Sequence, residues 1–352
     1  MSGDGKNVLF TLGRPFSSLY SLAMSLRAFF YRRGILATQR LPVPVISVGN
    51  LTMGGTGKTP LVMCVVRHLL EHGRRPAIVS RGYGGKARGR VNVVSNGREK
   101  KLDPAMAGDE PWLLADSLPG VPVVTGARRA EVGRYVLEKT SSDIIVLDDG
   151  FQHLALHRDL DLVLFNVQSE LSTARVFPGG ELRESFGALR RAHALIVTGV
   201  DYRTERRAHA LKRFLRERAP QAPVFFGEYL PVCLLSNGKQ EVFPSDKAKR
   251  LTLFGFCGIG NPTSFRETLH KEGYRLGGFR SFRDHHPYSG KDFESLVAAA
   301  KACKAQALIT TEKDFVKLKP FWGDFPVLAL KVELFMEESF EPFLADRLAP
   351  LL

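Results

Sequence analysis

The stretch with the clearest chemistry is a glycine-rich run that ends in Gly57-Lys58-Thr59. Glycines let backbone N–H groups converge on phosphate oxygens without side chains in the way. A lysine at this place reaches the β- and γ-phosphates of a nucleotide, and the hydroxyl after it takes a Mg²⁺ site. An apolar run precedes the stretch and a helical pattern follows it, which is the context that a P-loop requires. The residues assigned to the loop are Thr52, Met53, Gly54, Gly55, Thr56, Gly57, Lys58 and Thr59.

The loop departs from the usual spacing G-x-x-x-x-G-K-[ST], because Thr52 stands where the first glycine belongs. The paired Gly54-Gly55 instead resembles the variant loop of bacterial partitioning and positioning ATPases. Those proteins carry a second lysine just before the paired glycines, and here that residue is Met53. At this point a glycine-rich turn that binds nothing also remains possible.

Two carboxylates follow a run of apolar residues later in the chain. Residues 144–147 are Ile-Ile-Val-Leu, and Asp148-Asp149 come directly after them. A buried strand that delivers acids at its carboxyl end brings metal ligands to a phosphate loop. Gln152 and His153 follow closely, and either side chain could reach the phosphates. The alternative for the acid pair is a solvated strand end.

Asp109 and His285 have no explanation in nucleotide binding. Asp109 precedes Glu110-Pro111 and a helical pattern, which suits an N-terminal helix cap. It could instead take a proton from an acceptor hydroxyl during phosphorylation. His285 follows Asp284 and precedes a proline, so it suits a turn, but it could also orient or charge-balance a catalytic carboxylate.

Several arginines stand beside glycines or at expected helix starts, where they are either surface charges or contacts to phosphate or substrate. Arg81 and Tyr83 lie in a glycine-rich segment after an apolar run. Arg129 opens a helical pattern, and Arg183 follows Pro178-Gly179-Gly180.

The elements that must position these residues alternate between strand and helix, which predicts an α/β fold on a parallel sheet. The expected strands are 43–48, 76–79, 121–124, 144–147, 160–165 and 194–197, and the expected helices are 59–72, 110–118, 127–139 and 203–218. After residue 220, Asn237-Gly238 between apolar runs indicates a hairpin. A second α/β section begins near residue 251.

The residues from Pro15 to Gly34 form an amphipathic pattern that is too polar to span a membrane. Leu19, Leu22, Ala23, Leu26, Phe29 and Phe30 make its apolar stripe. Such a helix either docks on its own domain or lies in a lipid interface.

The composition limits the classes of function that the chain can have. The chain has 352 residues, which predicts about two domains, and its 44% hydrophobic content excludes a disordered chain or a small disulfide scaffold. With 50 Lys and Arg against 36 Asp and Glu, the net charge of +14 favours an anionic partner. Four cysteines without metal or redox spacing indicate a reducing compartment, and we expect no secretory signal.

Taken in order, these segments resemble the tetraacyldisaccharide 4'-kinase family of the bacterial lipid A pathway. The resemblance spans roughly residues 47–317. Ser-Arg-Gly-Tyr-Gly, Asp-Asp-Gly-Phe-Gln-His and Thr-Glu-Lys-Asp are its most specific strings. The segments are 49–59, 80–85, 108–111, 148–153, 178–184, 284–285 and 311–314.

The resemblance implies transfer of the γ-phosphate of ATP to the 4'-hydroxyl of a tetraacylated glucosamine disaccharide 1-phosphate lipid, with Mg²⁺. It implies a peripheral, monotopic protein at the cytoplasmic face of the bacterial inner membrane, with no nucleic-acid partner and no obligate protein partner. It implies Asp109 as the catalytic carboxylate, His285 as its partner and Lys58 as a catalytic residue. Gln152 joins the loop as a nucleotide-binding residue. The implied metal and phosphate-site residues are Thr59, Glu110, Asp148 and Asp149, and the implied lipid contacts are Arg81, Tyr83, Arg129 and Arg183.

The expected fold is a P-loop NTPase-type parallel sheet domain with a second, smaller α/β domain joined by a β-hairpin linker. The expected divisions are a membrane-contact segment at 1–40, the P-loop kinase domain at 41–220, the linker at 221–250 and the smaller domain at 251–352. Two alternatives stay open. One is a membrane-associated P-loop positioning or partitioning ATPase. The other is a nucleic-acid-binding module, which no recognised binding motif supports.

Overall fold

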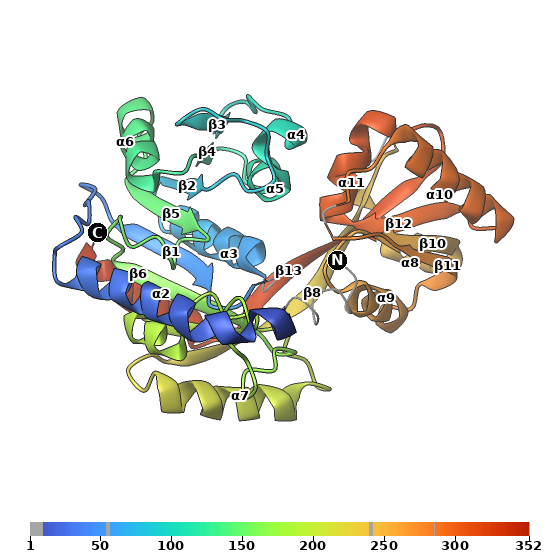
Figure 1. The fold of residues 1–352 in the computed structure, drawn as a ribbon. Coiled ribbons are helices and arrows are strands. Elements are labelled where there is room, and N and C mark those ends of the chain that lie inside the picture. The colour runs from blue at the N-terminus through green and yellow to red at the C-terminus, as the bar shows by residue number, and fades with distance from the viewer. Residues whose placement is uncertain (1–9, 54–56, 239–241, 285, 352) are drawn as a thin grey trace. The chain divides into compact units, whose positions relative to one another are not determined.

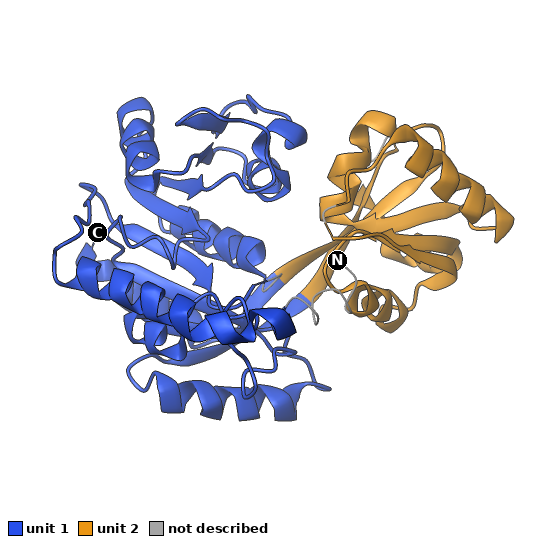
Figure 2. Ribbon diagram, viewed as in Figure 1, with its two compact units in different colours: residues 1–229, 334–352 blue, residues 230–333 orange. Residues whose placement is uncertain are grey.

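The computed structural model describes residues 10–53, 57–238, 242–284 and 286–351. The chain forms two compact units (Figure 2). Unit 1 consists of Met1–Tyr229 and Leu334–Leu352, and unit 2 of Leu230–Glu333. The chain leaves unit 1 inside strand β8 (Val224–Ser236) and returns to it inside strand β13 (Val327–Met336).

Unit 1 is built on a sheet with the strand order β8-β7-β6-β1-β5-β2-β4-β3 (Figure 1). From β8 to β4 neighbouring strands run parallel, and β3 is antiparallel to β4. The further strands of this sheet are β1 (Val45–Asn50), β2 (Pro76–Ser80), β3 (Asn92–Asn96), β4 (Pro122–Thr125), β5 (Ile144–Asp148), β6 (Leu160–Asn166) and β7 (Ala194–Thr198).

Helices cover this sheet, so its central strands are buried along their whole length, as parallel strands usually are. Helix α3 packs against β1 and β5, α6 against β2 and β4, and α7 against β7. The helical segments of unit 1 are η1 (Arg14–Phe16), α2 (Ser17–Arg32), α3 (Lys58–Glu71), α4 (Pro104–Ala107), α5 (Asp109–Ser117), α6 (Arg129–Lys139), η2 (Phe186–Arg191), α7 (Glu205–Arg218), α12 (Phe340–Leu348) and η4 (Ala349–Leu351).

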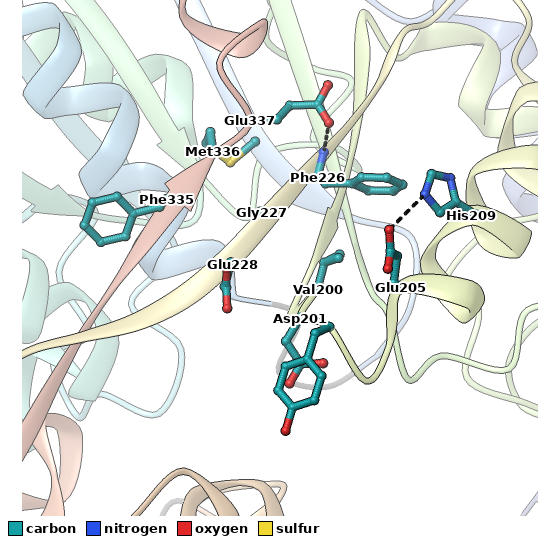
Figure 3. Close-up of a pocket in the computed structure, with 11 residues that line it drawn as sticks. Val200, Asp201, Glu205, His209, Phe226, Gly227, Glu228, Phe335, Met336 and Glu337 are labelled. Carbon is teal, nitrogen blue, oxygen red and sulfur yellow. Dashed lines mark hydrogen bonds and ion pairs between the residues drawn. The ribbon is translucent and has the colours of Figure 1, made fainter. Parts of the chain in front are cut away.

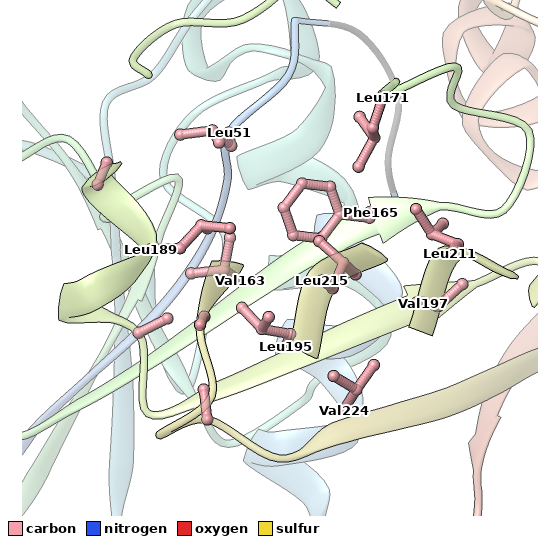
Figure 4. Close-up of a cluster of buried hydrophobic side chains, with 14 of the residues drawn as sticks. Leu51, Val163, Phe165, Leu171, Leu189, Leu195, Val197, Leu211, Leu215 and Val224 are labelled. Carbon is pink, nitrogen blue, oxygen red and sulfur yellow. The ribbon is translucent and has the colours of Figure 1, made fainter. Parts of the chain in front are cut away.

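Figure 4 shows how one face of this sheet is covered. Alternate residues of neighbouring strands, such as Phe165 of β6 and Val197 of β7, pack with Leu211 and Leu215 of α7 in one buried cluster. Since side chains alternate across a strand, the residues between them face the other side of the sheet. The apolar runs seen in the sequence therefore reflect burial on both faces.

The predicted strands and helices of this part of the chain are confirmed, with ends shifted by a few residues. Strand β3 was not expected. It lies at the edge of the sheet, and three of its five residues are Asn or Ser. An edge strand is covered less completely, so its sequence carries a weaker apolar signal.

Unit 2 contains a smaller sheet in the order β11-β10-β12-β13-β8, in which the strands from β11 to β13 run parallel. Its elements are β9 (Val242–Phe243), α8 (Ser245–Arg250), β10 (Thr252–Cys257), α9 (Pro262–Lys271), β11 (Arg275–Ser281), α10 (Gly290–Ala302), β12 (Ala307–Thr311), α11 (Glu312–Leu318) and η3 (Lys319–Phe321). The Thr-Glu-Lys-Asp string begins α11: the Thr311 side chain caps the helix, and buried Asp314 accepts a hydrogen bond from the Gly258 N–H at 2.8 Å.

The predicted division of the chain differs from these units in two places. The hairpin of β8 and β9, with pairs such as Leu234 and Phe243, lies inside unit 2 and is not the linker. Two strands far apart in sequence, β8 and β13, connect the units instead. The last residues belong with unit 1, where the ring of Phe340 packs on that of Phe225 with their centroids 5.3 Å apart. Such long-range pairing leaves no local pattern.

Candidate active site

The phosphate loop connects β1 to α3 at the carboxyl edge of the unit 1 sheet. Gly54, Gly55 and Thr56 lie outside the described residues. Gly57 has a left-handed backbone with φ of 85°, which favours glycine, and it is the N-cap of α3. Lys58 and buried Thr59 are the first residues of that helix. A helix N-terminus with its unpaired N–H groups is suited to binding phosphate.

The start of the loop is held by a segment far along the chain. The Met53 N–H donates to the Glu181 carbonyl at 2.7 Å, and the Arg183 N–H donates to the Leu51 carbonyl at 2.8 Å. Thr52 is buried between these contacts. The loop is therefore anchored by residues 181–183, which end in a predicted site residue.

Asp149 brings together two other predicted residues, Lys58 and Arg183. It follows β5, and β5 lies beside β1, so both strands end at the same edge. The Lys58 Nζ lies 3.7 Å from its Oδ1, and the Arg183 Nη1 lies 2.9 and 2.8 Å from its two carboxylate oxygens. Burial acts to raise the pKa of Asp149, but the charges of Lys58 and Arg183 outweigh it, so the pKa lies below its ordinary value.

Asp148 has a different environment. The Ser80 hydroxyl donates to its Oδ2 at 2.9 Å, while its buried Oδ1 has no hydrogen-bond partner among the described residues. Burial, followed by the negative charge of Glu110, raises the pKa of Asp148 to about 7. A buried carboxylate oxygen without a partner beside a second acid is suited to a cation.

The predicted basic residues lie in three different settings. Arg183 pairs with Asp149, as described. Arg129 is buried, and its Nη1 donates to the Ala127 carbonyl at 2.9 Å. Burial and the positive charge of Arg81 lower its pKa to about 10, against the opposing charges of Asp149 and Asp148. Arg129 therefore lies at the acid pair, whereas Arg81 and Tyr83 are exposed.

Gln152 contacts the strand that leads into the loop. Its Nε2 donates to the Asn50 carbonyl at 2.9 Å, and its Oε1 accepts from the Arg183 Nη1 at 3.4 Å. It links the last residue of β1 to the arginine that holds Asp149.

Asp109 and Glu110 open α5. The N-cap of this helix is Gly108, with φ of 91°, so the alternative that Asp109 itself caps the helix is wrong. Both acids are half-buried in the first turn, where the helix dipole stabilises negative charge. His285 lies outside the described residues, and its pairing with Asp109 stays a prediction.

A pocket of about 370 Å³ opens in unit 1 where β7 ends and β8 passes (Figure 3). Val200 and the ring of Phe226 form part of its apolar lining. Its acids are Asp201, Glu205, Glu228 and Glu337. The pocket lies close to the loop, because a Cβ on Gly57 would be 3.7 Å from the hydroxyl of Thr198, two residues before Val200.

Two further side chains contact the site residues. Ser80 opens the Ser-Arg-Gly-Tyr-Gly string quoted from the sequence and ends β2, which pairs with β5, but no role for its hydroxyl followed from the sequence. Tyr229 packs its hydroxyl against Gly57, and no local pattern marks it. Within the described ranges, no group of three or more His, Cys, Asp or Glu side chains is arranged to hold a metal by itself.

A parallel sheet with a lysine-bearing loop at a helix N-terminus, facing acids at the end of the neighbouring strand, defines a P-loop phosphotransfer protein. The family comparison specifies it further. The family model for tetraacyldisaccharide-1-P 4'-kinase matches residues 9–349, and the chain belongs to that family. This membership gives no support to the alternatives of a positioning ATPase or a nucleic-acid-binding module.

Individual relatives agree with the family model. The tetraacyldisaccharide 4'-kinase of Desulfotalea psychrophila is 46% identical, over 96% of each chain. That of Syntrophus aciditrophicus is 39% identical, over 93% of this chain and 90% of the relative. A crystal structure described as an "apo" form of LpxK from Aquifex aeolicus in complex with ATP is 36% identical, with a TM-score of 0.77 over 96% of this chain and 97% of that one.

Proposed function

We propose that this chain transfers the γ-phosphate of ATP to the 4'-hydroxyl of a tetraacylated glucosamine disaccharide 1-phosphate. The observation that carries the proposal is the convergence on Asp149 of Lys58 from the phosphate loop and Arg183 from the segment that anchors this loop. Phosphoryl transfer needs little covalent chemistry from a protein, so positioned charge supplies most of the catalysis. Family membership names the acceptor class.

The residues present fit a magnesium ion. The unpartnered Oδ1 of Asp148 and the hydroxyl of Thr59 would hold it, with phosphate oxygens completing the set, since Mg²⁺ is commonly bound through one or two carboxylates. When bound, Mg²⁺ would neutralise charge on the β- and γ-phosphates. Asp149 is already engaged by two cations, which makes it the residue that positions Lys58 and Arg183.

The acceptor side of the reaction is assigned to Asp109. Its carboxylate would take the proton of the 4'-hydroxyl as the new O–P bond forms and the bond to the ADP leaving group breaks. Arg129 lies at the acid pair with a buried Nε that has no partner among the described residues. A buried guanidinium of this kind favours contact with a phosphate group. Arg81 and Tyr83 are exposed and remain candidates for the lipid headgroup.

The pocket beside Gly57 is where we place the nucleoside part of ATP. Its acids repel phosphate groups, but their oxygens accept hydrogen bonds from an amino group or from ribose hydroxyls. The apolar surface of Val200 and Phe226 suits a flat base. The phosphates would then run from this pocket along the loop toward Lys58.

We further propose that α2 rests on the cytoplasmic face of the inner membrane and makes the protein peripheral and monotopic. Along this helix Leu19, Leu22 and Leu26 are 67%, 55% and 45% exposed, and Arg32 and Arg33 stand at its end. Exposed apolar side chains next to arginines are typical of helices in the headgroup layer of anionic lipid. Over the described ranges, none of the helices has the length and apolar character to span a bilayer. ATP and an acylated acceptor would meet at this surface.

The test measures transfer of radiolabelled γ-phosphate from ATP to the disaccharide 1-phosphate in detergent micelles, with mass analysis of the product. The variant Lys58→Ala should lose about 10²–10³-fold in turnover, as is usual when one preorganised charge contact is removed. The matched control Lys139→Ala changes an exposed lysine at the end of α6 and should be unaffected. ATP hydrolysis at the same rate with and without acceptor would instead indicate an ATPase.

A further inference from the structure

Helix α2 has an inner face as well as an exposed one. The side chains at Ser17, Tyr20 and Arg27 recur at helical spacing and are half-buried. The Gly179 N–H donates to the Ser17 hydroxyl at 2.9 Å, and the ring of Tyr20 packs on that of Phe177 at 5.4 Å. The helix is therefore seated on the segment around residues 177–179.

At two glycines, the start of α2 and the segment around residues 177–179 lie too close together for a side chain to fit between them. A Cβ on Gly13 would lie 2.3 Å from the Pro178 carbonyl oxygen, and one on Gly179 would lie 2.3 Å from the Ser17 hydroxyl. Contacts of this kind fix the helix start against the backbone of the segment. This close packing explains why the sequence at 178–180 is Pro-Gly-Gly.

The same segment continues directly into the site. Glu181 and Arg183 bond through their backbones to the start of the phosphate loop, and the Arg183 side chain holds Asp149. A displacement of the segment would move both the loop and the acid.

Arg27 makes a second connection between α2 and the site. Its Nη1 donates to the main-chain carbonyl of Gln152 at 3.3 Å. The Gln152 side chain in turn bonds to the Asn50 carbonyl and to Arg183. A continuous set of contacts therefore runs from Arg27 through Gln152 and Arg183 to Asp149 and Lys58.

We propose that α2 is a positioning element of the phosphate site and that Arg27 is its positioning residue. Arg27 acts through Gln152, which aligns Arg183 with Asp149. The proposal rests on the proposed kinase function, and it adds a role for α2 that does not require lipid. Because the helix is a rigid element, the face toward the site and the exposed face move together. The position of α2 on residues 177–179 therefore sets the geometry at Asp149.

The experiment uses the full chain in detergent micelles with ATP and the acylated disaccharide 1-phosphate, and no bilayer is present. Arg27→Met keeps the apolar stem and removes the donors. We expect about a 10-fold loss of kcat, with the KM values for ATP and acceptor within about twofold, because groups that align a reacting charge act on the chemical step. Arg27→Lys can still donate to the Gln152 carbonyl and should recover part of the loss.

Arg216→Met on α7 is the matched control, because it removes an exposed arginine from another helix of unit 1. It should keep wild-type kcat. Thermal unfolding is measured for every variant, and Arg27→Gln replaces Arg27→Met if the latter does not fold. Wild-type kcat in the folded Arg27 variant overturns the proposal. An equal loss in Arg27→Lys overturns the assigned contact. A wild-type chain without transfer activity would instead refute the kinase function itself.

Discussion

The hydroxyl of Tyr229 lies where a side chain on Gly57 would begin: a Cβ added to Gly57 would be 1.5 Å from that oxygen. Tyr229 also hydrogen-bonds to Thr198, and burial raises the pKa of its phenol to about 12, so it stays protonated at neutral pH. Gly57 immediately precedes Lys58, and Tyr229 is the last residue of unit 1 before the chain enters unit 2. This contact fixes the end of the phosphate loop.

Replacing Gly57 by alanine tests that contact. The backbone with φ of 85° adds strain of about 1–2 kcal/mol, and the collision with Tyr229 adds displacement of the loop. We expect Gly57→Ala to lower kcat at least about 10-fold. The control is Gly73→Ala, where φ is 71° and nothing lies within 4 Å of the added Cβ, so only strain is introduced. Turnover and melting temperature are compared. Equal effects of the two substitutions on turnover would contradict a role for the Tyr229 contact.

The exposed leucines of α2 are the second test. Serine at Leu19, Leu22 and Leu26 together should move the protein from anionic vesicles into the soluble fraction, because burial of apolar groups in lipid contributes about 0.8 kcal/mol per CH₂. Sedimentation with vesicles measures this, and Leu70→Ser, an exposed leucine of α3, serves as the control. Unchanged sedimentation of a folded triple variant would remove the membrane assignment of this face.

Val200 tests the nucleoside pocket. It is half-buried at the pocket wall, so Val200→Phe should fill space that we assign to the base. We expect the KM for ATP to rise about 10-fold while kcat changes little, since the loss is one of uniform binding. The KM for the disaccharide should stay the same, which serves as the internal control. An unchanged KM for ATP would place the nucleoside elsewhere.

His153 gives a prediction about pH and stability. Burial, followed by the positive charges of Arg129 and Arg158, lowers its pKa to about 4 from an ordinary value of 6.5. Between these values the unfolded chain binds the proton and the folded chain does not, so folding stability falls as the pH drops from about 6.5 to about 4. Because His153 keeps part of its solvent exposure, we expect the free energy of unfolding to fall by roughly 1–2 kcal/mol over this pH range.

Chemical denaturation of wild type and His153→Gln at a series of pH values checks this expectation. The variant should lose less stability over that range, and the two proteins should have parallel profiles above about pH 7, where the histidine is neutral in both states. Parallel profiles through the acid range as well would show that His153 titrates normally in the folded protein.

The sequence by itself determined the local chemistry. Gly57-Lys58-Thr59 between an apolar run and a helical pattern, and Asp148-Asp149 at the end of another apolar run, predicted the loop and the acids at one sheet edge. This works because parallel strands are buried on both faces, so each one is a short apolar run and its carboxyl end is known. The strand and helix positions of unit 1 followed from the same periodicity.

Only the tertiary structure decided which residues work together over long distances in the chain. The pairing of Arg183 with Asp149, the Ser80 bond to Asp148 and the contact of Tyr229 with Gly57 join segments that no spacing relates. The amphipathic pattern of α2 likewise fitted a docked helix or a lipid-facing one. In the structure, the face of α2 that carries Arg27 packs on the site, and Leu19 and Leu22 are exposed. This orientation depends on packing against residues 177–179 and 152. A one-dimensional pattern does not contain these contacts.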